Sequence, residues 1–394
     1  MTGNLAGGKP WTSDAPVRST QVWLAPGMVN FGIGQPDFDL LPLDIMHQAA
    51  EHRLGQKNPY LLNYGSEQGD GYFRQALSEF LVPYYGAAID AGRTIVTAGA
   101  SQGLDMICTL FTKPGDTILV EEPSYFLALR IFEDHDLRVI SLPTDENGLI
   151  VDALEAAIVR YSPAFLYLIP TFQNPTGVTL SAARRQQLVK VAASRNLLIL
   201  ADEVYHLLNY AEATPRPLAL YADNAPILSL GSFSKILAPG LRLGWIQGTP
   251  ALIDRITRCG LLDSGGCPSH FTSGLVRSVL ELDLLAPYVD TMKQEYGARS
   301  RSLSAALRAE IPEARFDDAA GGFFLWLTLP HGVDTSDLLR FAEARQVSYV
   351  PGSRFSSSNG LRSALRLSFA FHDTRALALG VVRLREALYA YGRR

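Results

Sequence analysis

Short apolar runs alternate with longer segments of helical periodicity through the middle of the chain. The apolar runs are rich in Val, Ile and Leu and are bounded by Gly, Pro, Asn or Asp, which is typical of strands buried on both faces. The expected strands cover residues 94–98, 116–120, 137–141, 165–170, 197–201, 227–230 and 243–247. Helices are expected between them, for example at 101–112, 124–134, 180–194 and 249–260. This alternation predicts an α/β fold with a mostly parallel central sheet and helices on both faces.

The pattern changes after Pro287. A long helical stretch at 288–310 is followed by expected strands near 322–329, 346–350 and 364–370 and by expected helices at 335–344 and 374–391. This second pattern predicts a smaller α+β domain. A chain of 394 residues is long enough for two domains, and it contains no internal repeat.

A lysine in a hydroxyl-rich turn carries the strongest chemical signal. The segment Ser232-Phe-Ser-Lys235 follows an apolar strand, and Arg242 comes shortly after it. The amine of Lys235 can form a Schiff base with a carbonyl group. Ser232 and Ser234 can donate hydrogen bonds to phosphate oxygens, and Arg242 can make a charged, forked contact to the same group. The segment therefore indicates a phosphorylated carbonyl cofactor, although a lone lysine in such a turn is more often a solvated surface residue.

Two further motifs follow apolar strands. Asp202 stands at the end of the run 197–201, with Tyr205 three residues later, and Asn174 follows the run 165–170. A carboxylate at a strand end can keep the ring nitrogen of pyridoxal 5'-phosphate (PLP) protonated, while Tyr205 and Asn174 can hydrogen-bond the ring oxygen. A strand-end Asp also caps helices, and Asn-Pro-Thr-Gly is also a common turn, so neither motif decides alone.

Two weaker motifs have the same position relative to a strand. Tyr125 follows the run 116–120 and can lie flat on a cofactor ring, or else pack in the core. Ser101 and Gln102 open a helix directly after Gly99, where free backbone N–H groups can bind a phosphate.

Together these residues resemble the fold-type I PLP-dependent aminotransferases of class I and II. The resemblance extends from about Asn30 to about Arg385 and rests on the joint match in identity, order and approximate spacing. The chain is most similar to the branch with 2-aminoadipate and kynurenine aminotransferases, and to the aminotransferase-like domains of MocR-type regulators. The matching residues are Asn174, Asp202, Tyr205, Ser232, Ser234, Lys235 and Arg242.

The resemblance implies a division of the chain and a carboxylate site. The large PLP-binding domain is expected at 46–287, and the small domain that closes over the substrate at 1–45 and 288–394. Arg366, in an alternating strand, is expected to bind the α-carboxylate of the amino acid, with Gly34 as a backbone contact. Tyr64 is expected to reach the phosphate across a dimer interface, so that two chains share each active site.

The composition indicates which kinds of partner and metal site can be expected. Hydrophobic residues make up 47% and charged residues 19% of the chain, and the net charge is −4, which gives no reason to expect nucleic acid or a membrane as partner. Cys108, Cys259 and Cys267 have spacings that suit neither a zinc site nor a disulfide framework, and no metal site is expected. Reduced thiols fit a cytoplasmic location. The polar segment Met1–Pro26 is expected to be loose or to wrap a partner chain.

The expected activity is transfer of an amino group between an L-amino acid and a 2-oxo acid through a Schiff base on Lys235. A PLP-dependent oxidase, lyase or cyclase acting on an amino acid stays open as an alternative, as does a non-catalytic, regulator-like PLP-binding protein. The sequence does not identify the substrate. Its side-chain pocket is expected to draw on Trp326, Tyr349, Arg354 and the segment 265–271.

Overall fold

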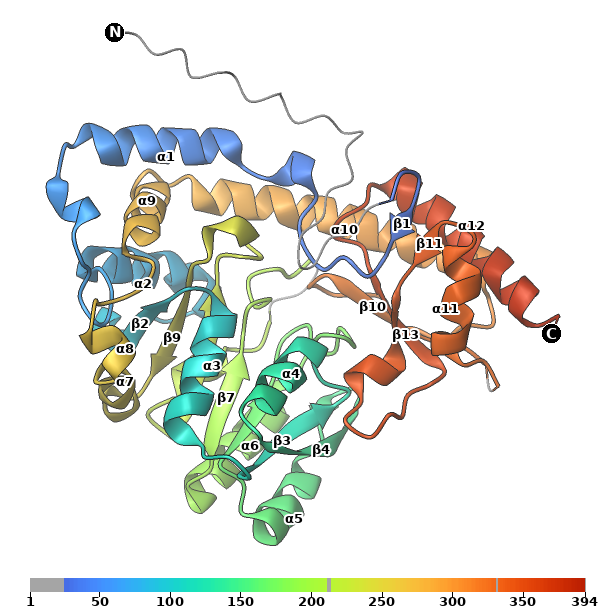
Figure 1. The fold of residues 1–394 in the computed structure, drawn as a ribbon, viewed down its shortest axis with the longest axis horizontal. Helices are drawn as coiled ribbons and strands as arrows, with labels where there is room; N and C mark the ends of the chain where they lie inside the picture. The colour runs from blue at the N-terminus through green and yellow to red at the C-terminus, as the bar shows by residue number, and fades with distance from the viewer. Residues whose placement is uncertain (1–24, 211–213, 331, 394) are drawn as a thin grey trace, which may run out of the picture.

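The computed structural model describes residues 25–210, 214–330 and 332–393. Figure 1 shows a large sheet with its helices and a smaller sheet beside it, with the long helix α10 (Leu285–Glu310) running along both parts. The expectation for Met1–Pro26 falls almost entirely outside the described residues.

Eight strands form the large sheet, in the order β2-β9-β8-β7-β6-β3-β4-β5. Neighbouring strands from β8 through β4 are parallel, whereas β9 runs antiparallel to both β2 and β8, and β5 runs antiparallel to β4. The mostly parallel sheet expected from the sequence is thereby confirmed. The strands are β2 (Thr94–Thr97), β3 (Thr117–Glu122), β4 (Arg138–Asp145), β5 (Gly148–Leu149), β6 (Phe165–Leu168), β7 (Leu198–Asp202), β8 (Ile227–Ser232) and β9 (Gly244–Gly248).

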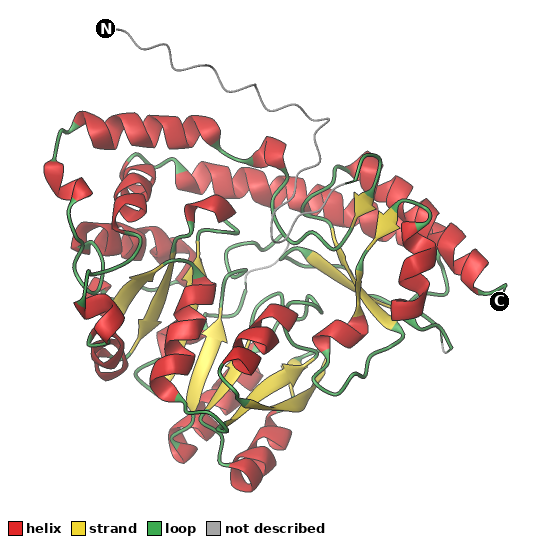
Figure 2. Cartoon of the chain, viewed as in Figure 1, coloured by secondary structure: helices red, strands yellow, loops and turns green. Residues whose placement is uncertain are grey.

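Helices cover both faces of this sheet (Figure 2). Val120 of β3 belongs to one hydrophobic core with Phe132, whereas Leu119, its neighbour in the chain, belongs to a separate core with Leu154 and Leu188. Successive residues of a strand point to opposite faces, which explains the two cores. The first core lies under α3 (Ala100–Phe111) and α4 (Phe126–Asp134), and the second under α5 (Val151–Tyr161) and α6 (Ala182–Arg195).

Further helices pack beside the β2 edge. They are α1 (Leu43–Gly55), α2 (Gly71–Tyr85), α7 (Pro250–Thr257), α8 (Gly260–Asp263) and α9 (His270–Glu281). The sequence pattern did not single out α1, because this helix buries only Ala49 and Arg53 and therefore has no apolar stripe.

The smaller sheet is antiparallel, in the order β10 (Phe324–Thr328), β13 (Ala364–Ser368) and β12 (Val350–Pro351). Helices α11 (Thr335–Glu343) and α12 (Thr374–Tyr391) pack beside it together with α10. The N-terminal strand β1 (Val29–Asn30) pairs in parallel with β11 (Val347–Ser348). The early strand β1 therefore lies beside a strand of the smaller part.

Two expectations for this part need correction. The single strand expected at 346–350 is divided into β11 and β12, which pair with different strands. The helix expected to begin at residue 288 begins at Leu285, with Pro287 in its first turn, where a missing N–H breaks no helical hydrogen bond.

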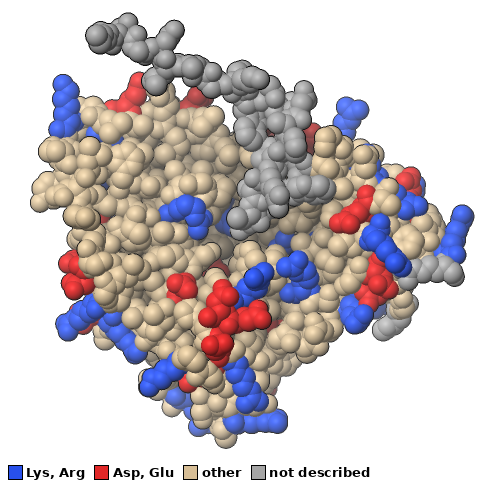
Figure 3. All heavy atoms as spheres, viewed as in Figure 1, with Lys and Arg blue, Asp and Glu red and all other residues tan. Residues whose placement is uncertain are grey.

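Acidic and basic side chains are interspersed over the face shown in Figure 3. No helix in the described part of the chain has the length and apolarity to cross a bilayer.

Candidate active site

The sheet topology gathers the expected site residues at one edge. Because β9 is antiparallel to both β2 and β8, the carboxyl ends of β2, β3, β6, β7 and β8 all point to the same edge, where α/β sheets bind ligands. A cavity of about 570 Å³ lies there. Nine of the expected residues line it: Ser101, Tyr125, Asn174, Asp202, Tyr205, Ser232, Ser234, Lys235 and Arg242.

Lys235 follows β8 and extends into this cavity. Its Nζ donates a hydrogen bond of 2.8 Å to the carbonyl oxygen of Gly34 and lies 5.4 Å from the ring centre of Phe323. Burial, together with the nearby cations Arg366 and Arg242, lowers the pKa of Lys235 to about 8, although Asp202 opposes this shift. A neutral amine, which is the nucleophilic form, is therefore accessible near neutral pH.

Asp202 ends β7 and lies buried in the cavity wall. Its Oδ2 accepts a 2.9 Å hydrogen bond from the hydroxyl of Tyr167, whereas its buried Oδ1 has no hydrogen-bond partner among the described residues. Burial raises the pKa of Asp202 to about 6, although the Tyr167 hydroxyl and Lys235 favour the carboxylate. The free Oδ1 can accept an N–H from a bound ring. Sequence reasoning missed Tyr167, and a tyrosine within an otherwise apolar strand was its only signal.

Groups that attract anions line the opposite end of the cavity. Helix α3 begins at Ala100 without a side-chain cap, so its first N–H groups, near Ser101, are available to a ligand. The backbone N–H of Ser234 donates to the Ser232 hydroxyl at 3.1 Å, which brings both serines into one tight turn. A helix N-terminus beside two hydroxyl groups can hold a phosphate.

Arg242 adds a cation to this end. It donates hydrogen bonds to the backbone carbonyls of Pro239 and Ala98, and no carboxylate of the described residues lies within ion-pair distance of it. Gly99 has a φ of +85°, and a Cβ there would lie 2.9 Å from Nη2 of Arg242. The turn and the guanidinium therefore approach so closely that glycine is required.

The side chain of Gln102 does not line the cavity, and a phosphate contact from its backbone N–H at the start of α3 stays a prediction. Its Oε1 accepts the backbone N–H of Ala98 at 3.0 Å. The side chain thus folds back onto the turn before its own helix, as polar residues near helix starts often do.

Arg366 is buried behind the cavity. Its Nη1 donates to Asn174 Oδ1 at 2.8 Å, its Nη2 donates to the Gly32 carbonyl at 2.9 Å, and its guanidinium lies 4.0 Å from the ring centre of Phe324. Its Nε has no hydrogen-bond partner, and no carboxylate in the described part of the chain pairs with it. Burial lowers the pKa of Arg366 to about 10. A buried, unpaired guanidinium is costly and provides a site for an anion.

The remaining expected ring contacts surround the same space. Tyr205 is buried and packs edge-on against Phe323 and Phe324, and burial holds its pKa well above its ordinary value. Burial, with Asp202 nearby, raises the pKa of Tyr125 to about 12. Both phenols are therefore neutral donors at physiological pH.

Several expected residues lie apart from the cavity. Tyr64 is 79% exposed and touches Gly265. Tyr349 is buried and donates its hydroxyl to the Thr335 carbonyl, so it belongs to the core of the smaller part. Trp326 packs on Phe355.

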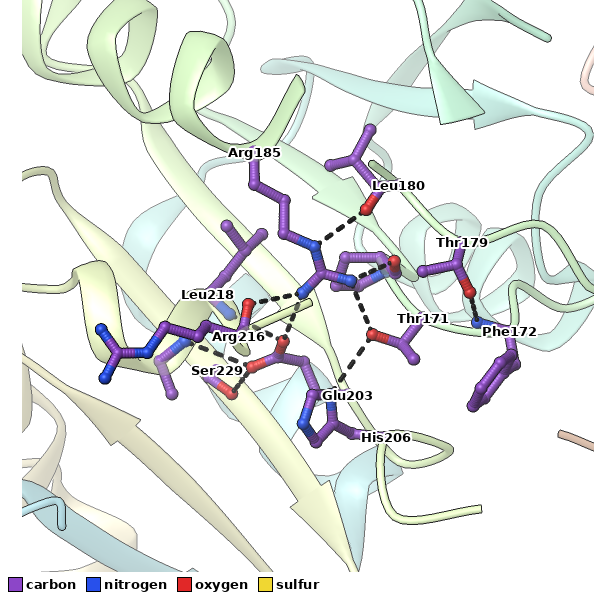
Figure 4. A network of polar contacts seen from close by, with 12 residues as sticks. Thr171, Phe172, Thr179, Leu180, Arg185, Glu203, His206, Arg216, Leu218 and Ser229 are labelled. Atoms are coloured by element: carbon purple, nitrogen blue, oxygen red, sulfur yellow. Dashed lines mark hydrogen bonds and ion pairs between the residues drawn. The ribbon is translucent and has the colours of Figure 1, made fainter. Parts of the chain in front are cut away.

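A buried polar network supports the end of β7 (Figure 4). Arg185 and Glu203 are fully buried and lie 3.8 Å apart. Glu203 accepts hydrogen bonds from Ser229 and from the backbone N–H of Leu218, and Arg185 donates to the Pro170 carbonyl. The segments after β6 and β7 are thereby held in one arrangement directly beside Asp202.

Fold and site together define an enzyme of the fold-type I PLP-dependent class. A family model described as aminotransferase class I and II matches residues 26–384, and the chain belongs to this family. The 2-aminoadipate transaminase of Thermus thermophilus is 32% identical over 371 residues, which are 92% of this chain and 90% of that protein. An HTH-type transcriptional regulator of Bacillus subtilis is 27% identical over 368 residues, 91% of this chain and 73% of the regulator.

A solved structure agrees with these relatives. The α-aminoadipate aminotransferase of Thermus thermophilus, in complex with N-(5'-phosphopyridoxyl)-L-leucine, has a TM-score of 0.85, is 30% identical and covers 93% of each chain. The expected family, fold and activity are confirmed: the protein is a PLP-dependent aminotransferase that moves an amino group between an amino acid and a 2-oxo acid.

The residues of the cavity fit this cofactor. The buried Oδ1 of Asp202 suits a protonated ring nitrogen, and the start of α3 with Arg242 suits the phosphate. Lys235 lines the same cavity, so its amine would be available to the aldehyde group of the cofactor.

Proposed function

We propose that Lys235 is the lysine that binds PLP covalently and that Asp202 pairs with its ring nitrogen. The main support for this proposal is that the buried Oδ1 of Asp202, which has no hydrogen-bond partner among the described residues, lies in the same cavity as a lysine whose pKa is lowered to about 8. Ser101, Ser232, Ser234 and Arg242 are assigned to the phosphate, Asn174 and Tyr205 to the ring oxygen, and Tyr125 to the ring face. When bound, PLP supplies an electron sink for the carbanion formed at the amino acid's Cα.

The same groups account for proton movement. Lys235 would take the proton from Cα of the bound amino acid and give it to the carbon of PLP that was its aldehyde carbon, because an amine with a pKa near the working pH serves both as base and as acid. Asp202, kept as a carboxylate by the ring's N–H, holds that proton on the ring. Tyr205 and Asn174 orient the ring through its oxygen.

Arg366 is assigned to the α-carboxylate that amino acids and 2-oxo acids share. The orphaned Nε and the absence of a paired carboxylate among the described residues support this assignment. Gly34 lies at the same place, since a Cβ on it would be 3.9 Å from Nη2 of Arg366. Its carbonyl already accepts from Lys235, so the loop that carries Gly34 connects the two groups.

The enzyme is further proposed to be a cytoplasmic homodimer of amino acid biosynthesis, with a large domain at 46–287 and a small domain formed by 1–45 and 288–394. Tyr64 would complete the phosphate site of the partner chain. Large apolar side chains near it are strongly exposed, including Tyr60 at 71% and Leu62 at 78%, as an interface between two chains would need. The cysteines, all unpaired, support a reducing compartment.

A panel of L-amino acids with 2-oxoglutarate or pyruvate, read by mass spectrometry, tests the activity. The expected result is a new amino acid from the oxo acid together with the oxo acid of the donor. Release of ammonia or consumption of oxygen without a new amino acid would instead identify a lyase or an oxidase. A Lys235→Ala protein that still forms a borohydride-reducible bond between PLP and a lysine would overturn the assignment of Lys235.

A further inference from the structure

A carboxylate at the end of β3 joins the two parts of the molecule. Glu122 Oε1 accepts the hydroxyl of Ser356, and its Oε2 accepts the hydroxyl of Ser141 at 2.7 Å and the backbone N–H of Ser357 at 3.4 Å. Ser141 lies on β4 of the large sheet, whereas Ser356 and Ser357 lie in the loop between β12 and β13 of the smaller part. The group formed by Glu122, Ser141, Ser356 and Ser357 is called the Glu122 clasp.

Hydrogen-bond donors of the clasp face both carboxylate oxygens of Glu122. The Ser356 hydroxyl oxygen accepts the backbone N–H groups of Ser358 at 3.2 Å and Gly360 at 3.0 Å, and it donates its own hydrogen to Glu122, with the Ser358 hydroxyl also within 3.1 Å of it. The Ser357 N–H can only donate. A glutamine at position 122 has one acceptor oxygen and one amide nitrogen, and in either orientation the nitrogen faces a donor.

The loop held by the clasp forms part of the surroundings of Arg366. The fully buried ring of Phe355 lies 5.2 Å from the Arg366 guanidinium, 5.3 Å from the ring of Phe126 and 5.6 Å from the ring of Trp326. A further backbone bond of 2.9 Å, from Ser124 to the Phe355 carbonyl, ties this residue to the loop after β3. Release of the clasp would therefore loosen one wall of the pocket around Arg366.

We propose that Glu122 is a positioning residue that sets the affinity for the substrate carboxylate by holding Phe355 against Arg366. The proposal rests on the assignment of Arg366 to the α-carboxylate. Glu122 touches neither the cavity nor, in the described part of the chain, any basic side chain within ion-pair distance. Replacing Glu122 should therefore weaken substrate binding and leave the cofactor site and the proton transfers unchanged.

The kinetic test uses Glu122→Gln and Ser356→Ala in the PLP-loaded enzyme, with Glu155→Gln on the exposed face of α5 as the control for the change in charge. Each clasp variant should raise KM for the amino acid and for the oxo acid about tenfold, because a charged hydrogen bond contributes about that factor and the loop is held correctly for less of the time. The value of kcat should stay within about threefold, and PLP affinity should not change. The double variant should resemble the single ones, since both remove the same clasp.

A second readout needs no turnover. Trp326 packs on Phe355, so acrylamide quenching of its fluorescence, isolated by comparison with Trp326→Phe, reports how firmly the loop is held. Quenching should rise about twofold in both clasp variants and stay unchanged in Glu155→Gln. If Glu122→Gln does not fold, Ser356→Ala decides alone.

Either of two results would overturn the proposal: clasp variants with the KM and quenching of the control, or a loss confined to kcat. Neither result tests whether the enzyme transfers amino groups. A wild-type enzyme that transfers no amino group would refute the proposed function, and the quenching experiment would still judge the clasp.

Discussion

Replacing Asp202 with asparagine should affect the stability of the cofactor-free protein and the activity of the loaded enzyme in opposite directions. Burial raises the pKa of this carboxyl from 3.8 to about 6. Two pKa units at about 1.4 kcal/mol each amount to about 3 kcal/mol by which the folded, PLP-free protein disfavours the ionised side chain. The bound ring nitrogen offsets this cost, whereas the cofactor-free protein bears it in full.

The pH dependence of the free energy of unfolding follows from the raised pKa of Asp202. Because the folded-state pKa lies above the unfolded one, the favourable contribution of the protonated form is complete below 3.8 and is lost as the pH rises through about 6. The cost in the wild type is about 3 kcal/mol at pH 8 and about 1.5 kcal/mol at pH 5. The amide of Asp202→Asn does not titrate, so any cost of burying it is the same at both pH values.

Urea unfolding of the PLP-stripped proteins, followed by circular dichroism at pH 5 and pH 8, measures this effect. The free energy of unfolding of Asp202→Asn minus that of the wild type should be about 1.5 kcal/mol more positive at pH 8 than at pH 5. The exposed Asp44→Asn should show no such pH dependence. With PLP bound, Asp202→Asn should turn over at least about tenfold more slowly, the loss expected for one charged hydrogen bond. A difference that stays constant or shrinks toward pH 8, or normal turnover of the variant, would refute the reasoning.

Three further changes test the remaining assignments. Lys235→Ala should bind PLP without a covalent bond, seen as loss of the borohydride-stabilised mass increase and of the imine absorption band. Arg366→Ala should lower kcat/KM by about 2–5 kcal/mol for amino and oxo acids but not for the decarboxylated amine, because it removes the partner of a desolvated carboxylate; equal losses for acid and amine would contradict this. Tyr64→Ala alone should be severely impaired. Mixed with Lys235→Ala chains that exchange with it, it should regain part of the activity, because one active site of each mixed dimer is then intact. An active monomer in sedimentation would exclude a shared site.

The parallel sheet made the cavity predictable from the sequence. Apolar runs such as 197–201 predict buried strands, and parallel strands place their carboxyl ends at one edge, so Asp202 and Lys235 were expected together although β7 and β8 are separated by a long connection. The family resemblance then supplied Arg366, which lies on the other sheet and which no local pattern would have linked to this edge.

Other parts of the site left no pattern in the sequence. Tyr167 looks like any residue of a buried strand until β6 and β7 are placed side by side. Gln102 stands where a phosphate ligand is expected, yet its side chain bonds the turn before it. The clasp joins Glu122 to Ser356 across 234 residues, and a serine-rich loop after a strand is otherwise typical of a solvated turn.

Because β1 pairs with β11, near the other end of the chain, the order in which the protein can fold during synthesis is restricted. The backbone N–H of Asn30 bonds His372, a residue 342 positions later, and the ring of Phe31 is fully buried against α12 at Gly380. At about 5–20 residues per second, a ribosome needs about 20 to 70 seconds to add the intervening chain. During that time Phe31 and its apolar neighbours have no place to pack, even after β9, the last strand of the large sheet, has been synthesised. The strand β1 and Phe31 should therefore be among the last parts of the nascent chain to reach their final packing, because α12 is made so late.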